Sequence, residues 1–192
     1  MLPAILQSIY THPKLTKSQL RKIAVAHCKI EFSKGENVLT KGKILNAYYI
    51  IETGIFRSFT YDYNGNEITT ELTSSGEFII EVSSLFRRVP SEENIVALTD
   101  GVVWKLDFDI FQELFHKIEG LSEWGRSWMS NQLFISKQRA IEVRTKSAAE
   151  RYLDLLNERP EIIRQVPLKH IASYLGITDT SLSRIRKEII TP

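Results

Sequence analysis

The residues with the clearest chemical potential lie in the stretch LKHIASYLGITDTSLSRIRKE, at positions 168–188. It holds two short amphipathic segments separated by Gly176, and Thr178 stands just before the second segment. A glycine permits a tight reversal of the chain, and a threonine hydroxyl can accept hydrogen bonds from the first amides of a helix. Since the small Ala172 and the apolar Leu182 stand where two helices would cross, the spacing predicts a helix-turn-helix.

The second predicted helix would carry its polar side chains on one face. If Leu182, Ile185 and Ile189 point into the domain, the residues between them point outward. Arginine can bond bidentately to guanine, and hydroxyl groups can meet base edges or phosphates. Base-reading side chains are therefore predicted at Asp179, Thr180, Ser183 and Arg184. Phosphate contacts, which position the domain, are predicted at Lys169, Arg186, Lys187 and Arg164.

The distribution of charge along the chain agrees with a nucleic-acid contact near its C-terminal end. The formal net charge is only +2, but residues 1–119 carry 13 basic against 15 acidic residues, whereas residues 120–192 carry 12 against 8. Such a local excess suits a phosphate-binding surface. A solvated helical face, whose basic residues complement the helix dipole, is the alternative interpretation.

The elements that must position these residues change in type along the chain. Residues 27–107 contain seven short β-type segments separated by turns: HCKIEF, ENVLT, AYYIIE, IFRSFTYD, EITTELT, ENIVALT and GVVWKLD. Between two of them, Asn64-Gly65 predicts a tight hairpin turn, because both residues tolerate positive φ angles. This many short strands in so few residues predict a sandwich or a closed barrel.

Beyond residue 107 the apolar spacing becomes helical. Residues 108–118 place apolar side chains at three- and four-residue steps, as in a helix lying against the β part. A longer helix is predicted over 121–143, with a seam that a second copy of the chain would cover: Leu121, Trp124, Trp128 and Ile135. The alternative is that this seam is the core side of a helix packed on its own domain. A third helix is expected in the segment that begins at residue 147, and it should stop before Pro160.

Several classes of protein lack their signatures here. The apolar runs are too short to cross a bilayer, and residues 1–15 lack the basic region and cleavage site of a signal peptide, so we expect a cytoplasmic protein without a membrane contact. We expect no catalytic residue and no bound metal, because no HExxH motif, HxH pattern, nucleophile elbow or glycine-rich phosphate loop occurs. An enzyme built on a related barrel is the least favoured interpretation.

These residues resemble the Crp/Fnr family of bacterial transcription regulators along nearly the whole chain. The likeness is strongest in ASYLGITDTSLSRIRKE at 172–188 and next in GEFIIEVSSLF at 76–86, and other segments look like family members of the Bacteroidetes type. The resemblance implies an α+β fold, with an antiparallel, jelly-roll-like β-roll of the cyclic nucleotide-binding kind, a long dimerisation helix and a winged-type helix-turn-helix domain. The implied domains are 1–119, 120–145 and 146–192.

The segment at 76–86 is similar to the phosphate-binding cassette of that family, in which a glutamate holds the ribose hydroxyl and an arginine holds the cyclic phosphate. Glu81 occupies the glutamate position, but Ile80 replaces a glycine and Ser91-Glu92 stands where Arg-Ser is expected. An acidic pair would repel a phosphate, so we expect no cyclic AMP binding in the usual pose. Arg87 and Arg88 could reach an anion from another side, or else lie in solvent. The predicted effector-pocket residues are Glu81, Arg87, Arg88 and Ser91.

Other sensors of the family are not expected either. An iron–sulfur cluster needs several cysteines, and the chain has only Cys28. The four histidines show no spacing that indicates a haem ligand. We therefore expect no cofactor, and an effector that is absent, unfamiliar or a protein.

The resemblance also implies a wing beside the second helix of the helix-turn-helix, which we call the reader helix because it carries the predicted base-reading residues. Because the sequence ends four residues after Glu188, the wing is expected in NERPEIIRQVP at 157–167, as a small hairpin or turn in which Arg159 and Arg164 contact phosphates.

The function predicted from these features is a homodimeric, sequence-specific transcription regulator. Its partners would be double-stranded DNA, a second copy of the chain and, by resemblance, RNA polymerase. The alternative is a cyclic-nucleotide-like sensory module that acts through a protein partner.

Overall fold

The computed structural model, which describes residues 2–190, contains every strand predicted between residues 27 and 107. The strands pair antiparallel in two sheets, with the orders β1-β8-β3-β6 and β2-β7-β4-β5. An additional strand, β6, was not predicted, because two residues are too few to show a period. The strands are β1 (Cys28–Phe32), β2 (Asn37–Leu39), β3 (Ala47–Thr53), β4 (Phe56–Tyr61), β5 (Glu67–Thr73), β6 (Phe78–Ile79), β7 (Asn94–Ala97) and β8 (Gly101–Asp107).

The predicted hairpin joins β4 to β5. Gly65 has a φ of +82°, and the Asp62 carboxylate accepts hydrogen bonds from the amides of Asn64 at 2.8 Å and Asn66 at 2.9 Å. The turn is therefore stabilised locally, as its sequence predicted.

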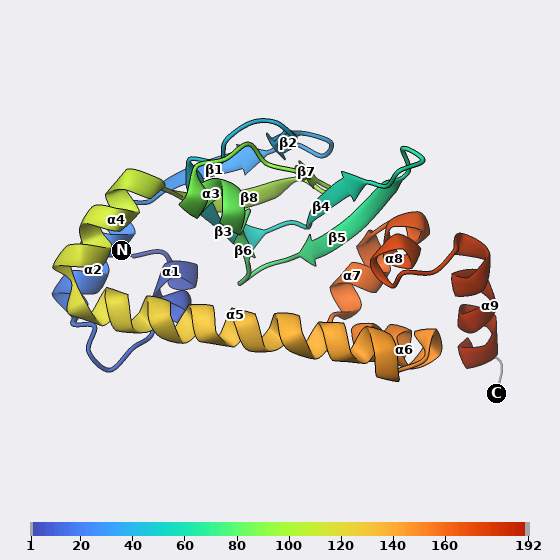
Figure 1. Cartoon of the computed structure of the whole chain (residues 1–192). Coiled ribbons are helices and arrows are strands. Elements are labelled where there is room, and N and C mark those ends of the chain that lie inside the picture. The colour runs from blue at the N-terminus through green and yellow to red at the C-terminus, as the bar shows by residue number, and fades with distance from the viewer. Residues whose placement is uncertain (1, 191–192) are drawn as a thin grey trace.

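Apolar side chains of the two sheets face each other and form the first hydrophobic core. Ile50 of β3, Phe56 of β4 and Val103 of β8 are completely buried in it. The helices α1 (Ala4–Ile9), α2 (Lys17–Val25) and α4 (Phe108–Lys117) cover one end of the roll (Figure 1). The short helix α3 (Val82–Arg87) lies between β6 and β7 in sequence.

The long helix α5 (Glu119–Thr145) has 27 residues and is therefore about 40 Å long. Figure 1 shows it running from α4, along the roll, to the C-terminal helices. Its buried residues lie in its first two turns, where it crosses the first core.

The prediction that Leu121, Trp124, Trp128 and Ile135 form a dimer seam is wrong. Leu121 is completely buried and Trp124 is 8% exposed, both within the first core of the same chain. The indole of Trp124 donates a hydrogen bond to the Ile9 carbonyl at 2.8 Å, and the Trp128 ring packs 4.8 Å from that of Phe78. The seam is thus the core side of a helix packed on its own domain, which was the alternative.

The C-terminal helices form a second core that includes side chains of the roll. These helices are α6 (Ala148–Glu158), α7 (Pro160–Gln165), α8 (Leu168–Tyr174) and α9 (Asp179–Ile190). Their buried residues, such as Ile162 and Leu182, pack in one cluster with Ile55 and Leu72. The C-terminal region therefore rests on the outside of the roll.

The predicted wing at 157–167 is also wrong, because this segment is helical. Pro160 stands in the first turn of α7, where its fixed φ suits a helix and its missing N–H costs nothing. Arg159 does not face outward: its guanidinium donates to the Leu72 carbonyl at 2.7 Å and to Glu77 at 2.5 Å. Arg159 thus fastens the C-terminal region to the roll.

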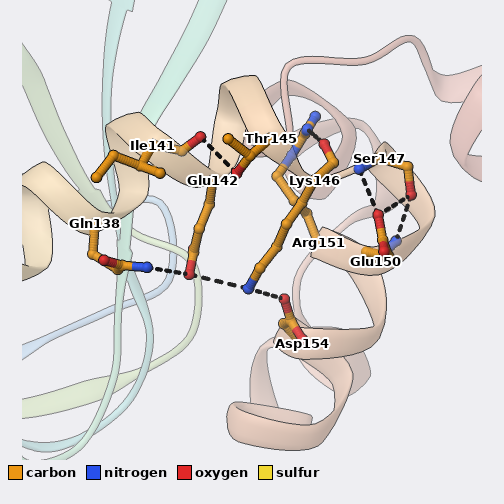
Figure 2. A network of polar contacts seen from close by, with 9 residues as sticks. All are labelled: Gln138, Ile141, Glu142, Thr145, Lys146, Ser147, Glu150, Arg151 and Asp154. Atoms are coloured by element: carbon orange, nitrogen blue, oxygen red, sulfur yellow. Dashed lines mark hydrogen bonds and ion pairs between the residues drawn. The ribbon is translucent and has the colours of Figure 1, made fainter.

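The connection between α5 and α6 is a single residue in extended conformation, followed by a helix cap. Lys146 has φ −103° and ψ 142°, and its ammonium bridges Glu142 at 3.1 Å and Asp154 at 2.9 Å. Ser147 and Glu150 form a reciprocal capping box at the start of α6. Figure 2 shows how this network joins the end of α5 to the start of α6.

Candidate nucleic-acid interface and effector cavity

The helix-turn-helix is present with the local contacts that its sequence predicted. Gly176 has a φ of +69°, and the amide of Ile177 donates to the Ala172 carbonyl at 3.0 Å. The Thr178 hydroxyl caps α9 by accepting a hydrogen bond from the Ser181 amide at 3.2 Å. The reversal and the start of α9 are therefore determined by adjacent residues.

Helix α9 has the predicted division between an inward and an outward face. Leu182 is completely buried, and Ile185 and Ile189 pack against the second core. The outward residues are exposed: Asp179, Thr180, Ser183, Arg184 and Lys187. All four predicted base-reading residues thus share one accessible face.

The predicted phosphate contacts differ in their surroundings. Lys169 and Arg164 are exposed on α8 and α7, next to α9 in the fold. Arg186 is half-buried, and its Nε is buried without a hydrogen-bond partner among the described residues. It falls four residues after Leu182, on the inward side of the helix, so its placement does not support a phosphate contact.

The helix α8 packs on strand β5 of the roll and leaves α9 at the outer end of the molecule (Figure 1). The Ser173 hydroxyl accepts a hydrogen bond from the Thr69 amide at 2.8 Å. Helix α8 thereby covers β5, which lies at the edge of its sheet. His170 of α8 is half-buried, and burial, together with nearby Arg57, lowers its pKa to about 4. This contact fixes how the helix-turn-helix is presented relative to the roll.

None of the four predicted effector-pocket residues lines the large cavity of the roll. Glu81 caps α3 instead, since its carboxylate accepts from the amides of Ser83 at 3.2 Å and Ser84 at 2.6 Å. Ser91 is 1% exposed and bonded to the backbone of Glu93. A carboxylate at the start of a short helix is satisfied by local amides.

The two predicted arginines lie outside the cavity as well. Arg87 is exposed at the end of α3. Arg88 donates to the Leu45 carbonyl at 3.2 Å and to the Asn46 side chain, and its guanidinium lies 5.2 Å from the centre of the Phe108 ring. Neither arginine therefore lines the large cavity of the roll.

A cavity of about 900 Å³ lies between the roll and α5, and we call it the effector cavity. Its polar lining is Thr70, Glu71, Thr73, Glu77, Glu93, Gln132, Ser136 and Arg139. Arg139 pairs with Glu71 at 3.0 Å, and Glu77 pairs with Arg159 at 2.5 Å. Burial raises the pKa of Glu93 and that of Glu77 above the usual value, so the cavity is unfavourable for an added negative charge.

Sequence reasoning missed Arg139 and the carboxylates around it as cavity residues. Arg139 is 68 positions from Glu71, and no local pattern joins them. The available signal was that Arg139 follows Ile135 by four residues and so shares its helix face.

Residues 2–190 contain neither a candidate metal site nor a membrane-spanning helix. No group of histidine, cysteine and carboxylate side chains there is arranged to hold a metal ion. None of the helices in this range combines the length and hydropathy that a bilayer crossing needs.

Comparisons with known proteins agree with this architecture. Residues 29–117, from β1 to the end of α4, match the family described as the cyclic nucleotide-binding domain. Over 183 residues the chain is 25% identical to the fumarate and nitrate reduction regulatory protein of Vibrio cholerae, which covers 89% of this chain and 72% of that protein.

Solved structures share the fold at low sequence identity. FixK2 from Bradyrhizobium japonicum has a TM-score of 0.73 at 16% identity, covering 86% of this chain and 85% of that one. A Crp/Fnr-family structure from Eubacterium rectale has a TM-score of 0.70 at 18% identity, covering 93% of this chain and 86% of that one. By its sequence relatives and its fold, the chain is similar to Crp/Fnr-type transcription regulators over most of its length.

Proposed function

We propose that this regulator is a homodimer that binds double-stranded DNA sequence-specifically in the cytoplasm and reads bases with α9. In this proposal residues 1–119 are the sensory domain, 120–145 the dimerisation helix and 146–192 the DNA-binding domain. A contact with RNA polymerase stays a prediction from the family resemblance.

The observation that carries the proposal is the exposed face of α9. A capped helix is anchored by buried Leu182 and presents Thr180, Ser183 and Arg184 to solvent at the outer end of the molecule. These side chains can bond base edges, and exposed Lys187 can neutralise a phosphate. A solvated surface helix would not need this turn geometry or this anchoring.

Homodimerisation is proposed through a different stripe of α5 from the one the sequence predicted. Met129, Leu133 and Val143 are 49%, 73% and 63% exposed, and with Ser136 and Ala140 they form an alternating four–three spacing. This is the spacing of a coiled-coil seam. Two copies paired along it would carry two reader helices, and successive major grooves lie about 34 Å apart.

The effector cavity supports a regulator that does not bind cyclic AMP in the usual pose. Glu81 is occupied as a helix cap, and Arg139 is paired with Glu71. A cyclic phosphate would therefore meet carboxylates without an unpaired arginine among the cavity-lining residues of the described chain.

The test is selection of bound fragments from genomic DNA by the purified full chain without ligand. The best fragment is then titrated at two salt concentrations. We expect a roughly palindromic consensus that binds much more tightly than random DNA, with an affinity that falls as salt rises. Absence of enrichment together with capture of a protein partner would instead favour the sensory module that acts through a protein.

Two variants of α9 separate base reading from phosphate binding. Arg184→Ala is expected to cost about 1–3 kcal/mol on the selected site and to relax preference at one base pair. Lys187→Ala, the matched control on the same exposed face, is expected to weaken binding to all DNA sequences similarly and to reduce the dependence of affinity on salt concentration. Equal losses on specific and random DNA for both variants would contradict the assigned roles.

A further inference from the structure

The effector cavity continues into a second chamber of about 160 Å³. The two spaces share five lining residues, Phe78, Ile80, Phe86, Trp128 and Met129. Protein interiors are close-packed and contain few voids larger than a water molecule. An apolar space of about 150 Å³ can hold one benzene molecule, so this chamber, which we call the aromatic chamber, has the size of a single ring.

Aromatic rings form most of the wall of the aromatic chamber. They belong to Tyr48, Phe78, Phe86, Phe111, Phe115, Trp124 and Trp128. Neighbouring centroids are 4.8 Å apart for Phe78 and Trp128, and 5.3 Å apart for Phe111 and Phe115, with tilted planes. Rings prefer such offset or tilted contacts, so the wall offers faces and edges to another flat ring.

The polar groups at the aromatic chamber are few. The Tyr48 hydroxyl is bonded to that of Tyr10 at 2.6 Å, and the Trp124 indole N–H is bonded to the Ile9 carbonyl. Gln112, half-buried on α4, adds an amide to the lining. A ligand there therefore finds one amide that can bond a polar substituent.

Charge in the adjoining effector cavity disfavours an anion. Its arginine, Arg139, is paired with Glu71, while Glu77 and Glu93 add two further carboxylates. A negatively charged ligand would lose its hydration and meet these carboxylates. A neutral molecule avoids this cost.

The aromatic chamber opens to solvent at apolar side chains. Phe86 of α3 is 38% exposed and Met129 of α5 is 49% exposed, and both line the chamber.

From this geometry we propose that the effector of this regulator is a neutral, flat aromatic molecule whose ring enters the aromatic chamber. The inference rests on the proposed function, because it names the class of ligand that the sensory domain takes. Gln112 bonds a single polar substituent, and the large cavity accommodates what extends beyond the ring.

The test titrates the full chain with 4-fluorobenzyl alcohol, observed by fluorine NMR without DNA. We expect saturable binding, and binding of the anionic counterpart 4-fluorobenzoate at least tenfold weaker. Ile80→Phe, which adds bulk where the effector cavity meets the aromatic chamber, is expected to weaken binding of the alcohol at least tenfold. Ile44→Phe makes the same replacement at an exposed loop position outside the effector cavity and the aromatic chamber, and it is expected to leave binding of the alcohol unchanged.

A second variant keeps the test valid if Ile80→Phe fails to fold. Gln112→Leu is expected to weaken 4-fluorobenzyl alcohol severalfold and to leave fluorobenzene binding unchanged. Absence of saturable binding to the native chain, or equal affinity for alcohol and benzoate, would overturn the proposal. So would binding that disappears as the chain dimerises, because the second copy would then occupy the chamber.

These outcomes are separable from failure of the DNA-binding proposal. Ligand binding is read on the protein alone, whereas fragment selection is performed without ligand. A chain that selects a palindrome but binds no aromatic probe loses only the effector assignment.

Discussion

The two halves of α5 have similar apolar spacing but opposite surroundings. In the first half, Leu121 and Trp124 are buried in the core of the roll, whereas in the second half Leu133 and Val143 are 73% and 63% exposed. A helical period identifies an apolar stripe but not what covers it. The comparison teaches that α5 is anchored at one end by its own domain, whereas apolar side chains at its other end are exposed.

The largest effect is expected from Trp124→Ala in the first half of α5. The indole packs 4.7 Å from the Tyr10 ring and donates a hydrogen bond to the Ile9 carbonyl, so its loss leaves a core cavity and removes that bond. We expect a loss of about 3–5 kcal/mol in the free energy of unfolding, measured by urea titration. Phe134→Ala removes a ring that is 66% exposed in the second half, and in monomeric protein it should cost about 0.5 kcal/mol or less. Similar costs for both would remove the distinction between the halves.

Acid is expected to weaken the core beneath the first half. His27 is 7% exposed and lies 3.0 Å from the Tyr10 hydroxyl, and burial lowers its pKa to about 4. In the unfolded chain the histidine has its ordinary pKa of about 6.5, so as the pH falls the unfolded state binds the proton first. The contribution of neutral His27 to the free energy of unfolding is therefore complete above pH 6.5 and is lost as pH falls towards 4. Over this range the loss is about 3 kcal/mol, measurable from urea midpoints at each pH.

His27→Gln is the control for this pH dependence. The pKa of His170 is also lowered to about 4, so His170 would account for the pH dependence of the unfolding free energy that remains in the variant. A variant with the full native slope would show that His27 does not couple protonation to stability.

Dimerisation should respond to changes in the second half. Leu133→Asp places a charge within the exposed stripe, and we expect the dimer to weaken about a hundredfold, measured by sedimentation equilibrium. Asn131→Asp is the matched control, because Asn131 is exposed but lies off this stripe. A larger effect from Asn131→Asp would place the dimer contact on another face of α5 and contradict the proposed stripe.

The smallest effect is expected at the junction where the second half meets α6. Ser147→Ala removes a hydrogen bond to the Glu150 amide at 3.2 Å, within the network of Figure 2, and should cost about 1 kcal/mol in unfolding free energy. Ser127→Ala inside α5 should change it by about 0.5 kcal/mol or less, since alanine is the better helix former. Thermal unfolding of the two variants gives the comparison, and equal effects would show that the cap does not hold this junction.

Local chemistry made much of the architecture predictable. The hairpin at Asn64-Gly65 and the reversal at Gly176 depend on residues within one turn, whose φ angles and hydrogen bonds are set by their neighbours. The two faces of α9 follow from a 3.6-residue period, which predicted exposed Arg184 and buried Leu182.

The remaining errors arose where a pattern has more than one partner in space. Glu81 matched a cassette position, and in the structure its carboxylate caps α3 by accepting from the Ser84 amide at 2.6 Å. Arg159 was predicted to contact phosphate, yet it pairs with Glu77, which is 82 positions away. A sequence gives no distance between such groups.

The sequence by itself determined the strands, the helix-turn-helix and the side chains that α9 presents, because each depends on short-range periodicity or capping. Only the tertiary structure decided which face of α5 is covered, that 160–165 is helical rather than a wing, and which residues line the two chambers. These features depend on contacts between residues far apart in the chain, whose energies are comparable for several arrangements until the whole core is packed.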